Sequence, residues 1–565
     1  MKKLLAFMLM LIFAIVLVGC KPEEIKPASI TITGSQTVEV GKNIQLTATV
    51  NPAGAPQTVT WTSAKAEIAS VDATGKVTGV SGGATVIRAT STVDATVVGQ
   101  IRLTVTAEVS DNIDLGGYTI RIAQAGHALH ETNPFHDDYA AADKDAKMQA
   151  WTWVEDNYNC HIEVVAYPDD AEWGPPRWNY ILNQAASNTA DYDFYTIPDA
   201  QIGRFVEGNA IIDVSDWYAL YGKGYMDSVY AQSGSYQGGL YSITNGESGI
   251  YNVMYYNIGL FERLGMEKSP AQMFNDGDWT YTGFLNYALE AQAKLDALED
   301  ASASKKYWAV AGCAPYYWVG MVNAGGVKIA DLSTMTFQPL TDTAVTAAAT
   351  LRAIKEGNAM DPLKQVDQNV DSWMNNRALM CSGDLWFVNT SNRWKEDLWS
   401  PGDPDGTSYG YVPFPRPDGI TKDQQKLGLT GTATWAMPIG RSYAGYGAGC
   451  TTENIYRAIV KTFHLTKEYR LSSPGYDPEQ ALDDYARKYA EDDASIEAFK
   501  YIAGRAKTIG FYEPLAEPGN AVVNTGYSTF STAVNNYVMG TIATFSEAVE
   551  PLLAALQEAL TKAFS

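Results

Sequence analysis

The sequence predicts a multidomain chain in which a small all-β sandwich precedes a much larger α/β domain. Residues 29–106 contain short runs rich in Val, Ile and Thr, in which polar and apolar residues alternate between Gly and Asn-Pro turns. Alternating strands that are interrupted every 8–12 residues, roughly, are typical of an antiparallel sandwich. From residue 118 onward, strand and helix patterns follow one another in turn. That order predicts βαβ units and a parallel sheet covered on both faces.

The first 20 residues predict an export signal. Lys2 and Lys3 precede an apolar run, Leu4–Val18, which suits a signal peptide and is shorter than the about 20 residues that a membrane-spanning helix needs. The run ends in LVGC (17–20), which resembles the lipobox of bacterial lipoproteins. The resemblance implies that residues 1–19 are removed and that Cys20 carries lipid, with residues 20–28 as an anchored linker. The alternative is an ordinary signal peptide with an incidental cysteine.

Charge and cysteine spacing exclude several classes of partner. The formal net charge of −23 argues against nucleic acid and against an anionic lipid surface, so we expect membrane contact only through the anchor. The other cysteines are far apart and form no CxxC pair, so a zinc-site spacing is absent and we expect no metal or other cofactor. In an exported protein they allow three disulfide pairings, but buried free thiols fit equally well. These cysteines are Cys160, Cys313, Cys381 and Cys450.

The β-rich part, residues 29–107, resembles a known domain family. Its alternation predicts that Trp61, Ile68, Val71 and Val77 face the core between two sheets. The string VTWTSAKAEIASVDATGKVTGVSGGATVIRAT (59–90) then shows W-x-S, IASVD, G-x-VTGV and G-x-ATV in order. In this it resembles the group 2 bacterial immunoglobulin-like domain. The segment contains no His or Cys, so we expect a spacer, with adhesion as the alternative that the family also implies.

The large domain follows a linker at 108–117. Its pattern predicts strands at 118–123, 161–167 and 192–197, and helices at 139–158, 178–187 and 202–209. Ligands of such sheets bind beyond the carboxyl ends of the strands. This points to the segments 124–138 and 198–201 as candidate ligand contacts.

Five strings in the large domain are similar to family 1 extracellular solute-binding proteins, the sugar-binding lipoproteins of ABC importers. They are LYSITNGE (240–247), VMYYNIGLFERLGM (253–266), WTYTGFLNYA (279–288), RALMCSGDLW (377–386) and VPFPRPDG (412–419). The resemblance implies a type II periplasmic-binding-protein-like fold over residues 118–565. Two α/β lobes would be joined by crossing strands, one of them Tyr251–Tyr256, and would close around the ligand. It also implies ABC permease subunits as partners.

A sugar site needs flat rings for the C–H faces and polar side chains for the hydroxyl rim. Strand ends, turns and family motifs that combine both supply our candidate ligand contacts. We predict contacts from Asp384, Trp386, Asn245, Glu247, Trp318, Trp435, Asp199 and His127. His127, His130 and His136 lie within ten residues, beside carboxylates, which leaves a metal site as an alternative for that segment.

Signals of catalysis are weak. The chain has no Walker or protein-kinase motif, so we name no catalytic residue and expect no enzyme. A pair of glycosidase carboxylates among 64 Asp and Glu stays open. The sequence thus predicts a monomeric, lipid-anchored receptor on the extracytoplasmic face of a bacterial cell membrane, which binds an oligosaccharide for an ABC importer. The alternatives are a surface adhesin or enzyme acting on polysaccharide, and a receptor for a peptide or a metal.

Overall fold

The chain forms two compact units. The computed structural model describes residues 25–106, 112–139, 143–222, 226, 228–244, 250–298, 306–362, 370–389, 408–430, 434–515 and 527–564. The first unit contains the chain up to Asp111 together with Ser215–Lys223, and the second contains the rest.

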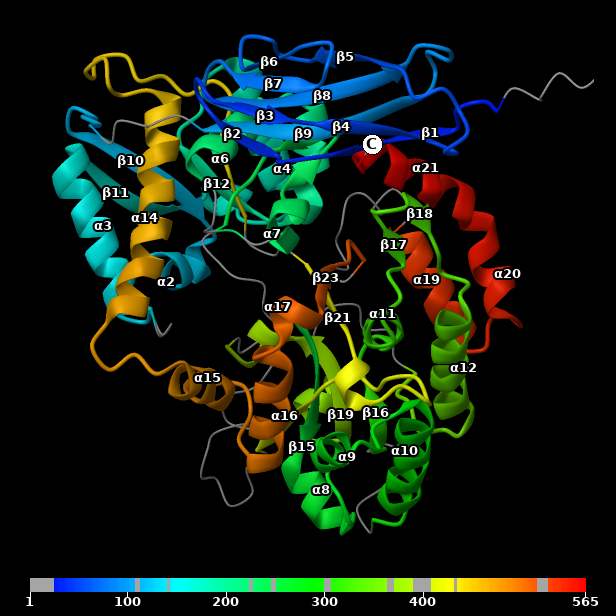
Figure 1. The fold of residues 1–565 in the computed structure, drawn as a ribbon. Coiled ribbons are helices and arrows are strands. Elements are labelled where there is room, and N and C mark those ends of the chain that lie inside the picture. Colours follow the sequence, from blue (N-terminus) through cyan, green and yellow to red (C-terminus); the bar gives the residue numbers. More distant parts are fainter. Residues whose placement is uncertain are drawn as a thin grey trace, which may run out of the picture. The chain divides into compact units, whose positions relative to one another are not determined.

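The first unit is a sandwich of short strands (Figure 1). One sheet has the order β2-β9-β8-β5, a second has the order β3-β7-β6, and β1 pairs with β4. The strands are β1 (Ser29–Thr33), β2 (Thr37–Glu39), β3 (Asn43–Gln45), β4 (Thr47–Asn51), β5 (Val59–Ser63), β6 (Ala69–Val71), β7 (Lys76–Gly79), β8 (Gly83–Ser91) and β9 (Val98–Thr106). Val77 and Ile68 are buried in its core, and Trp61 and Val71 pack against them. The predicted sandwich and its core positions are confirmed.

One helix of this unit comes from far along the chain. Helix α6 (Ser215–Tyr221) packs against β8 and β9. Lys65 Nζ lies 2.7 Å from the Asp216 carboxylate of this helix, in a half-exposed ion pair. The sequence did not predict this, because the local pattern of residues 215–221 does not show which sheet the helix covers.

Lobe 1 of the second unit is built on the sheet β11-β10-β12-β22. The first three strands run parallel, and β22 is antiparallel to β12. Helices α3 and α14 lie side by side (Figure 1). The elements of this lobe are β10 (Tyr118–Gln124), α3 (Lys144–Tyr158), β11 (Cys160–Ala166), α4 (Gly174–Ser187), β12 (Phe194–Ile197), α5 (Ile202–Glu207), β22 (Thr434–Ala436) and α14 (Thr452–Ser472). The predicted parallel sheet is confirmed, although α3 begins five residues later and α4 four residues earlier than the sequence predicts.

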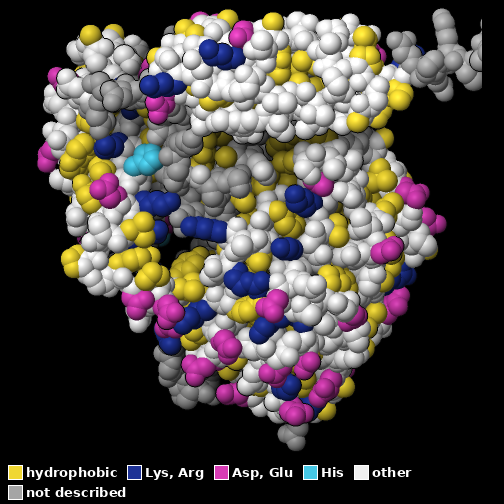
Figure 2. Space-filling model, viewed as in Figure 1, with side chains coloured by type: hydrophobic (Ala, Val, Ile, Leu, Met, Phe, Trp, Pro, Cys, Tyr) yellow, Lys and Arg dark blue, Asp and Glu magenta, His cyan; other side chains and the backbone are white. Residues whose placement is uncertain are grey.

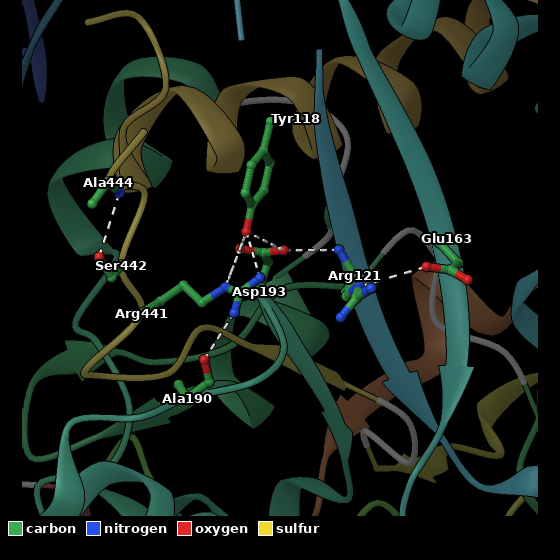
Figure 3. Close-up of polar contacts among 8 residues, drawn as sticks. All are labelled: Tyr118, Arg121, Glu163, Ala190, Asp193, Arg441, Ser442 and Ala444. Atoms are coloured by element: carbon green, nitrogen blue, oxygen red, sulfur yellow. Dashed lines mark hydrogen bonds and ion pairs between the residues drawn. The ribbon is translucent and has the colours of Figure 1, made fainter. Parts of the chain in front are cut away.

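A buried ion pair joins the amino ends of the lobe 1 strands (Figure 3). Asp193, just before β12, is fully buried, and Arg441 Nε lies 3.2 Å from its Oδ1. The Tyr118 hydroxyl donates to Asp193 at 2.9 Å, and the backbone N–H of Arg121 donates at 2.8 Å. Arg441 Nη1 also donates to the Ala190 carbonyl at 2.9 Å. Burial raises the pKa of Asp193, against the opposing effects of Arg441 and of the hydrogen bonds.

Lobe 2 is built on the sheet β16-β19-β15-β20. Its strands are β15 (Asn252–Asn257), β16 (Trp308–Ala311), β19 (Ala378–Asp384) and β20 (Tyr409–Val412). Every residue of β15 is buried, and the strand lies between β19 and β20. The prediction that Tyr251–Tyr256 crosses between the lobes is therefore wrong, because this apolar run is a central strand of lobe 2.

A short parallel ladder lies outside both sheets. Strand β21 (Leu427–Leu429) pairs with β23 (Gly510–Tyr512), and the chain after β21 continues to β22 of lobe 1. Leu429 and Tyr512 form a small apolar cluster with Val229, and Phe564 packs against it. This ladder is one of the described connections between the lobes; the segment between α14 and α15 is another.

The remaining helices cover lobe 2 and the connections. They are α2 (Leu129–Thr132), α7 (Ser228–Ser233), α8 (Ile258–Leu264), α9 (Pro270–Asp276), α10 (Tyr281–Asp296), α11 (Ala314–Ala324), α12 (Asp342–Glu356), α13 (Asp371–Met374), α15 (Pro478–Arg487), α16 (Asp493–Ala503), α17 (Ala506–Ile509), α19 (Tyr527–Val538), α20 (Phe545–Val549) and α21 (Leu553–Phe564). The Thr280 hydroxyl caps α10 by accepting from the Gly283 N–H at 3.2 Å. Within the described ranges, no helix combines the length and the apolar character needed to span a bilayer.

Candidate functional site

The carboxyl ends of three parallel strands meet at one edge of lobe 1. Strand β10 ends at Gln124, β11 at Ala166 and β12 at Ile197. His127 follows the first strand, Trp173 follows the second and Asp199 follows the third. Ligands of α/β sheets bind at such an edge. The topology thus brings two of the predicted residues, His127 and Asp199, to the same edge as Trp173.

An exposed tryptophan at this edge was not among the residues predicted from the sequence. Trp173 is 54% exposed. Gly174, which starts α4, has a φ of 57°, a conformation that favours glycine, and α4 then begins directly after the ring. Because the sequence predicts this helix only from residue 178, it does not place Trp173 in the short turn between β11 and α4. A tryptophan in such a turn is the signal that would have identified this residue.

Trp173 lies in a stack of flat groups. Its ring centroid is 5.2 Å from that of His127, with 33° between the ring planes. The Arg177 guanidinium carbon lies 4.6 Å from the Trp173 ring and 4.3 Å from the ring of Tyr167. Cation–π contacts of this kind hold an aromatic ring in a defined orientation. Trp173 and His127 thus form a half-exposed aromatic surface, which we call the Trp173 platform.

A carboxylate lies beside the Trp173 platform. Glu172 Oε1 accepts a hydrogen bond from the Gly126 N–H at 2.8 Å and lies 3.4 Å from His127 Nδ1. Partial burial acts against ionisation, but the hydrogen bonds from His127 and from the Gly126 backbone lower the pKa of Glu172 overall. The platform therefore combines an apolar ring face with an ionised acceptor at its rim.

Lobe 2 has a comparable edge. Strands β16 and β19 are parallel, so their carboxyl ends, Ala311 and Asp384, lie on the same side of the sheet. Asn252, at the start of the antiparallel strand β15, pairs directly with Asp384. Both side chains are buried, and α11 begins just after β16, at Ala314. The predicted residue Asp384 thus lies at the edge where lobe 2 would meet a ligand.

Asp199 has a different setting from the one predicted. Its side chain is buried, and its Oδ2 accepts hydrogen bonds at 3.2 Å from the Thr430 hydroxyl and at 3.2 Å from the Tyr512 hydroxyl. Tyr512 belongs to the ladder between the lobes, and Thr430 directly follows its strand β21. These contacts give Asp199 a role at the link between the lobes; contact with a solute stays a prediction.

Two predicted tryptophans are enclosed by protein. Trp318 is 0% exposed, its Nε1 donates to the Ala344 carbonyl at 2.9 Å, and Phe530 and Phe545 pack on its ring. Trp435 is 5% exposed in β22, between the rings of Phe194 and Phe463. Neither ring offers a free face, so the geometry gives no support to a sugar contact at these two positions.

Three predicted contacts involve side chains that lie outside the described residues. Asn245 and Glu247 lie outside the described residues. The Trp386 backbone lies in the 3₁₀ helix Leu385–Asn389, directly after β19, but its side chain is outside what the structure describes. Contact of these residues with a solute stays a prediction.

No metal or thiol centre accompanies these edges in the described part of the chain. Cys160, Cys313, Cys381 and Cys450 are free thiols. The described residues contain no group of three or more His, Cys, Asp or Glu that could hold a metal ion. Figure 2 shows Lys and Arg side chains around a hollow to the left of the centre, and Asp and Glu side chains interspersed with Lys and Arg over the lower part of the view.

A known domain family matches the amino-terminal part of the chain. Residues 25–108 match the family model described as Bacterial Ig-like domain (group 2). A 3-O-alpha-D-galactosyl-alpha-L-arabinofuranosidase of Bifidobacterium longum subsp. longum is 38% identical over 89 residues, which are 16% of this chain. The chain spans only 8% of the length of that curated relative.

Solved structures match most of the chain. The cyclic alpha-maltosyl-1,6-maltose binding protein from Arthrobacter globiformis aligns with a TM-score of 0.50 and 12% identity, over 79% of this chain and 99% of that chain. An extracellular solute-binding protein of family 1 aligns with a TM-score of 0.50 and 12% identity, over 78% of this chain and 100% of that chain. Residues 25–108 are therefore a group 2 bacterial Ig-like domain, and the α/β part of the chain has the two-lobed fold of extracellular solute-binding proteins.

Proposed function

We propose that this protein is the carbohydrate-binding receptor subunit of an ABC importer and that it binds an oligosaccharide by hinged closure of the two lobes. The observation that carries the proposal is the Trp173 platform at the carboxyl edge of lobe 1. Trp173 and His127 present ring faces, while Glu172 supplies an acceptor beside them. A sugar offers the complementary pattern, with apolar C–H faces and a rim of hydroxyl groups.

The two-lobed fold supplies the mechanism. Each lobe has a sheet edge where parallel strands end, with Trp173 at the edge of lobe 1 and Asp384 at that of lobe 2. A ligand that touches both edges binds the closed form better than the open form, and only this difference drives closure. A permease would then recognise the closed shape. The sugar leaves the site chemically unchanged.

Isothermal titration against a panel of mono- and oligosaccharides tests the proposal. We expect saturable heat with at least one oligosaccharide, and chromatography of the mixture afterwards should recover that sugar intact. Absence of binding to every sugar by a folded protein would contradict the proposal. Consumption of the sugar would instead indicate an enzyme.

Replacement of Trp173 by alanine should weaken the binding of that sugar about tenfold, or ~1.4 kcal/mol, because one ring face is lost. The matched control is Tyr446→Ala, since Tyr446 is 46% exposed but packs on Tyr118 at the amino end of the same sheet. This control should bind the sugar like the wild type. Equal affinities of the Trp173→Ala variant and the wild type would exclude Trp173 as a contact.

We also propose that Cys20 anchors the receptor to the membrane through lipid and that the Ig-like domain serves as a spacer. Cys20 lies outside the described residues, so this rests on the lipobox resemblance of residues 17–20. In cells, the wild-type chain should partition into the detergent phase of Triton X-114, whereas Cys20→Ser should stay in the aqueous phase. The same phase for both proteins would contradict lipidation of Cys20.

A further inference from the structure

The ladder between the lobes contains two neighbouring residues that are held by opposite lobes. Tyr512 is the last residue of β23, and Glu513 follows it. Successive residues of an extended chain point to opposite sides. The Tyr512 hydroxyl donates to Asp199 of lobe 1 at 3.2 Å, and the carboxylate of Glu513 accepts from lobe 2. We call Asp199, Tyr512 and Glu513 the hinge clasp.

The lobe 2 side of the hinge clasp is a buried carboxylate surrounded by neutral donors. Glu513 is 0% exposed. Its Oε2 accepts from the Ile329 N–H at 2.7 Å and from the Asn323 amide at 3.3 Å, and its Oε1 accepts from the Ala330 N–H at 3.3 Å. The Leu515 N–H also donates to Oε1 at 3.3 Å. These four donors fill both oxygens but bring no positive charge.

The backbone of Glu513 is hydrogen-bonded to β21. The Glu513 N–H donates to the Leu429 carbonyl at 2.9 Å, so Glu513 is joined at once to lobe 2 and to the strand that leads toward lobe 1. On the other side, Asp199 also accepts from Thr430, the residue that follows β21. Movement of one lobe against the other must therefore strain or break contacts of the hinge clasp.

Charged groups nearby are engaged elsewhere or lie at the surface. Lys328 Nζ lies 4.0 Å from Asp331 and 5.8 Å from the Phe511 ring. Lys426 precedes β21 and Lys507 lies in α17, and both are exposed. Helix α7, which packs against β23, carries no charged residue, and lobe 1 contributes Asp199. Burial raises the pKa of Glu513 to about 7, against the opposing effect of its hydrogen bonds.

We propose that Asp199, Tyr512 and Glu513 are positioning residues that fix the crossing ladder to both lobes, and that protonation of Glu513 favours the fixed state. The pH dependence of this clasp goes beyond sugar binding, although its effect on affinity rests on the proposed closure. The sign follows from linkage. Glu513 has a pKa of about 7 when it is buried in the hinge clasp and about 4.5 in water, so it binds a proton more tightly while the clasp is formed. Opening that exposes Glu513 to water is thus disfavoured in acid and becomes easier as the pH rises from about 4.5 to 7.

Hydrogen exchange of the ligand-free full chain tests this directly. After correction for intrinsic rates, the opening equilibrium that exposes the Ile329 and Ala330 amides should rise about tenfold between pH 6 and pH 8. Glu513→Gln should abolish this pH dependence, because it removes the titrating group. Asp331→Asn is the matched control, since hydrogen bonds from Ser333 keep the pKa of Asp331 below its usual value despite partial burial. It should leave the profile unchanged.

A second variant covers the case in which Glu513→Gln does not fold. Asn323→Ala removes one neutral donor from Glu513 and should move the midpoint of the profile to higher pH. A flat wild-type profile, a profile that persists in Glu513→Gln, or an unmoved midpoint in Asn323→Ala would overturn the proposal. Exchange is measured without sugar, so it tests the hinge clasp even if the protein binds no sugar. If titration identifies a sugar, its affinity should show the same pH dependence.

Discussion

Replacing Arg441 by methionine should lower the free energy of unfolding by about 3–5 kcal/mol, because it leaves the buried Asp193 carboxylate without its cation. Asp193 is 0% exposed and Arg441 is 18% exposed. The variant also loses the hydrogen bonds from Arg441 to Tyr118 and Ala190 (Figure 3). Urea unfolding of the full chain, followed by circular dichroism, measures the change.

Arg121→Met is the control for this experiment. Its guanidinium lies 3.6 Å from Glu163, and both side chains are about half exposed. Exposed pairs of this kind contribute roughly 0–1 kcal/mol. A similar loss of stability in both variants would show that the network at the amino ends of the strands is no stronger than a surface pair.

Truncation of Trp318 to alanine should destabilise the protein by about 3–5 kcal/mol, because it opens a cavity in the core of lobe 2. The ring is fully enclosed, and its Nε1 hydrogen bond to Ala344 is lost as well. Thermal or urea unfolding provides the measurement. Trp173→Ala is the contrast, since its ring is 54% exposed and its loss should change stability by less than about 1 kcal/mol.

The two tryptophan variants also decide between a core role and a ligand role. At a temperature where both are folded, Trp318→Ala should keep sugar affinity near that of the wild type, whereas Trp173→Ala should bind the sugar about tenfold more weakly. A stable Trp318→Ala variant with strongly reduced affinity would return Trp318 to the list of contacts that the sequence predicts.

The elements of the fold could be predicted where local pattern decides them. Strands β10, β11 and β12 fall where the sequence places them, because short runs rich in apolar and β-branched residues between helix patterns indicate the strands of a parallel sheet. The run at 251–256 has the same signature, and nothing local distinguishes a central strand from a connection between lobes. Its assignment required its partners β19 and β20, which lie more than 120 residues further along.

The candidate site could be predicted only in part. Asp199 was identified because it follows a strand, but its hydrogen bonds to Thr430 and Tyr512 span more than 200 residues and leave no trace in the local sequence. Trp318 follows a strand pattern in the sequence, but the structure buries it inside α11 together with Tyr316 and Tyr317. Trp173 was overlooked because its exposure depends on where α4 begins, and helix boundaries are the least certain part of a sequence pattern.

The late position of β22 has a consequence for biosynthesis. Thr434 pairs with Ile197, so the sheet of lobe 1 receives its edge strand about 240 residues after β12 has been made. Arg441, which pairs with Asp193, also arrives at that stage. At roughly 5–20 residues per second, synthesis of the chain between β12 and β22 takes tens of seconds. The sheet of lobe 1 cannot be completed before then. A nascent chain that stops before residue 434 should therefore bind chaperones and remain sensitive to proteases, whereas chains released after α14 should become resistant.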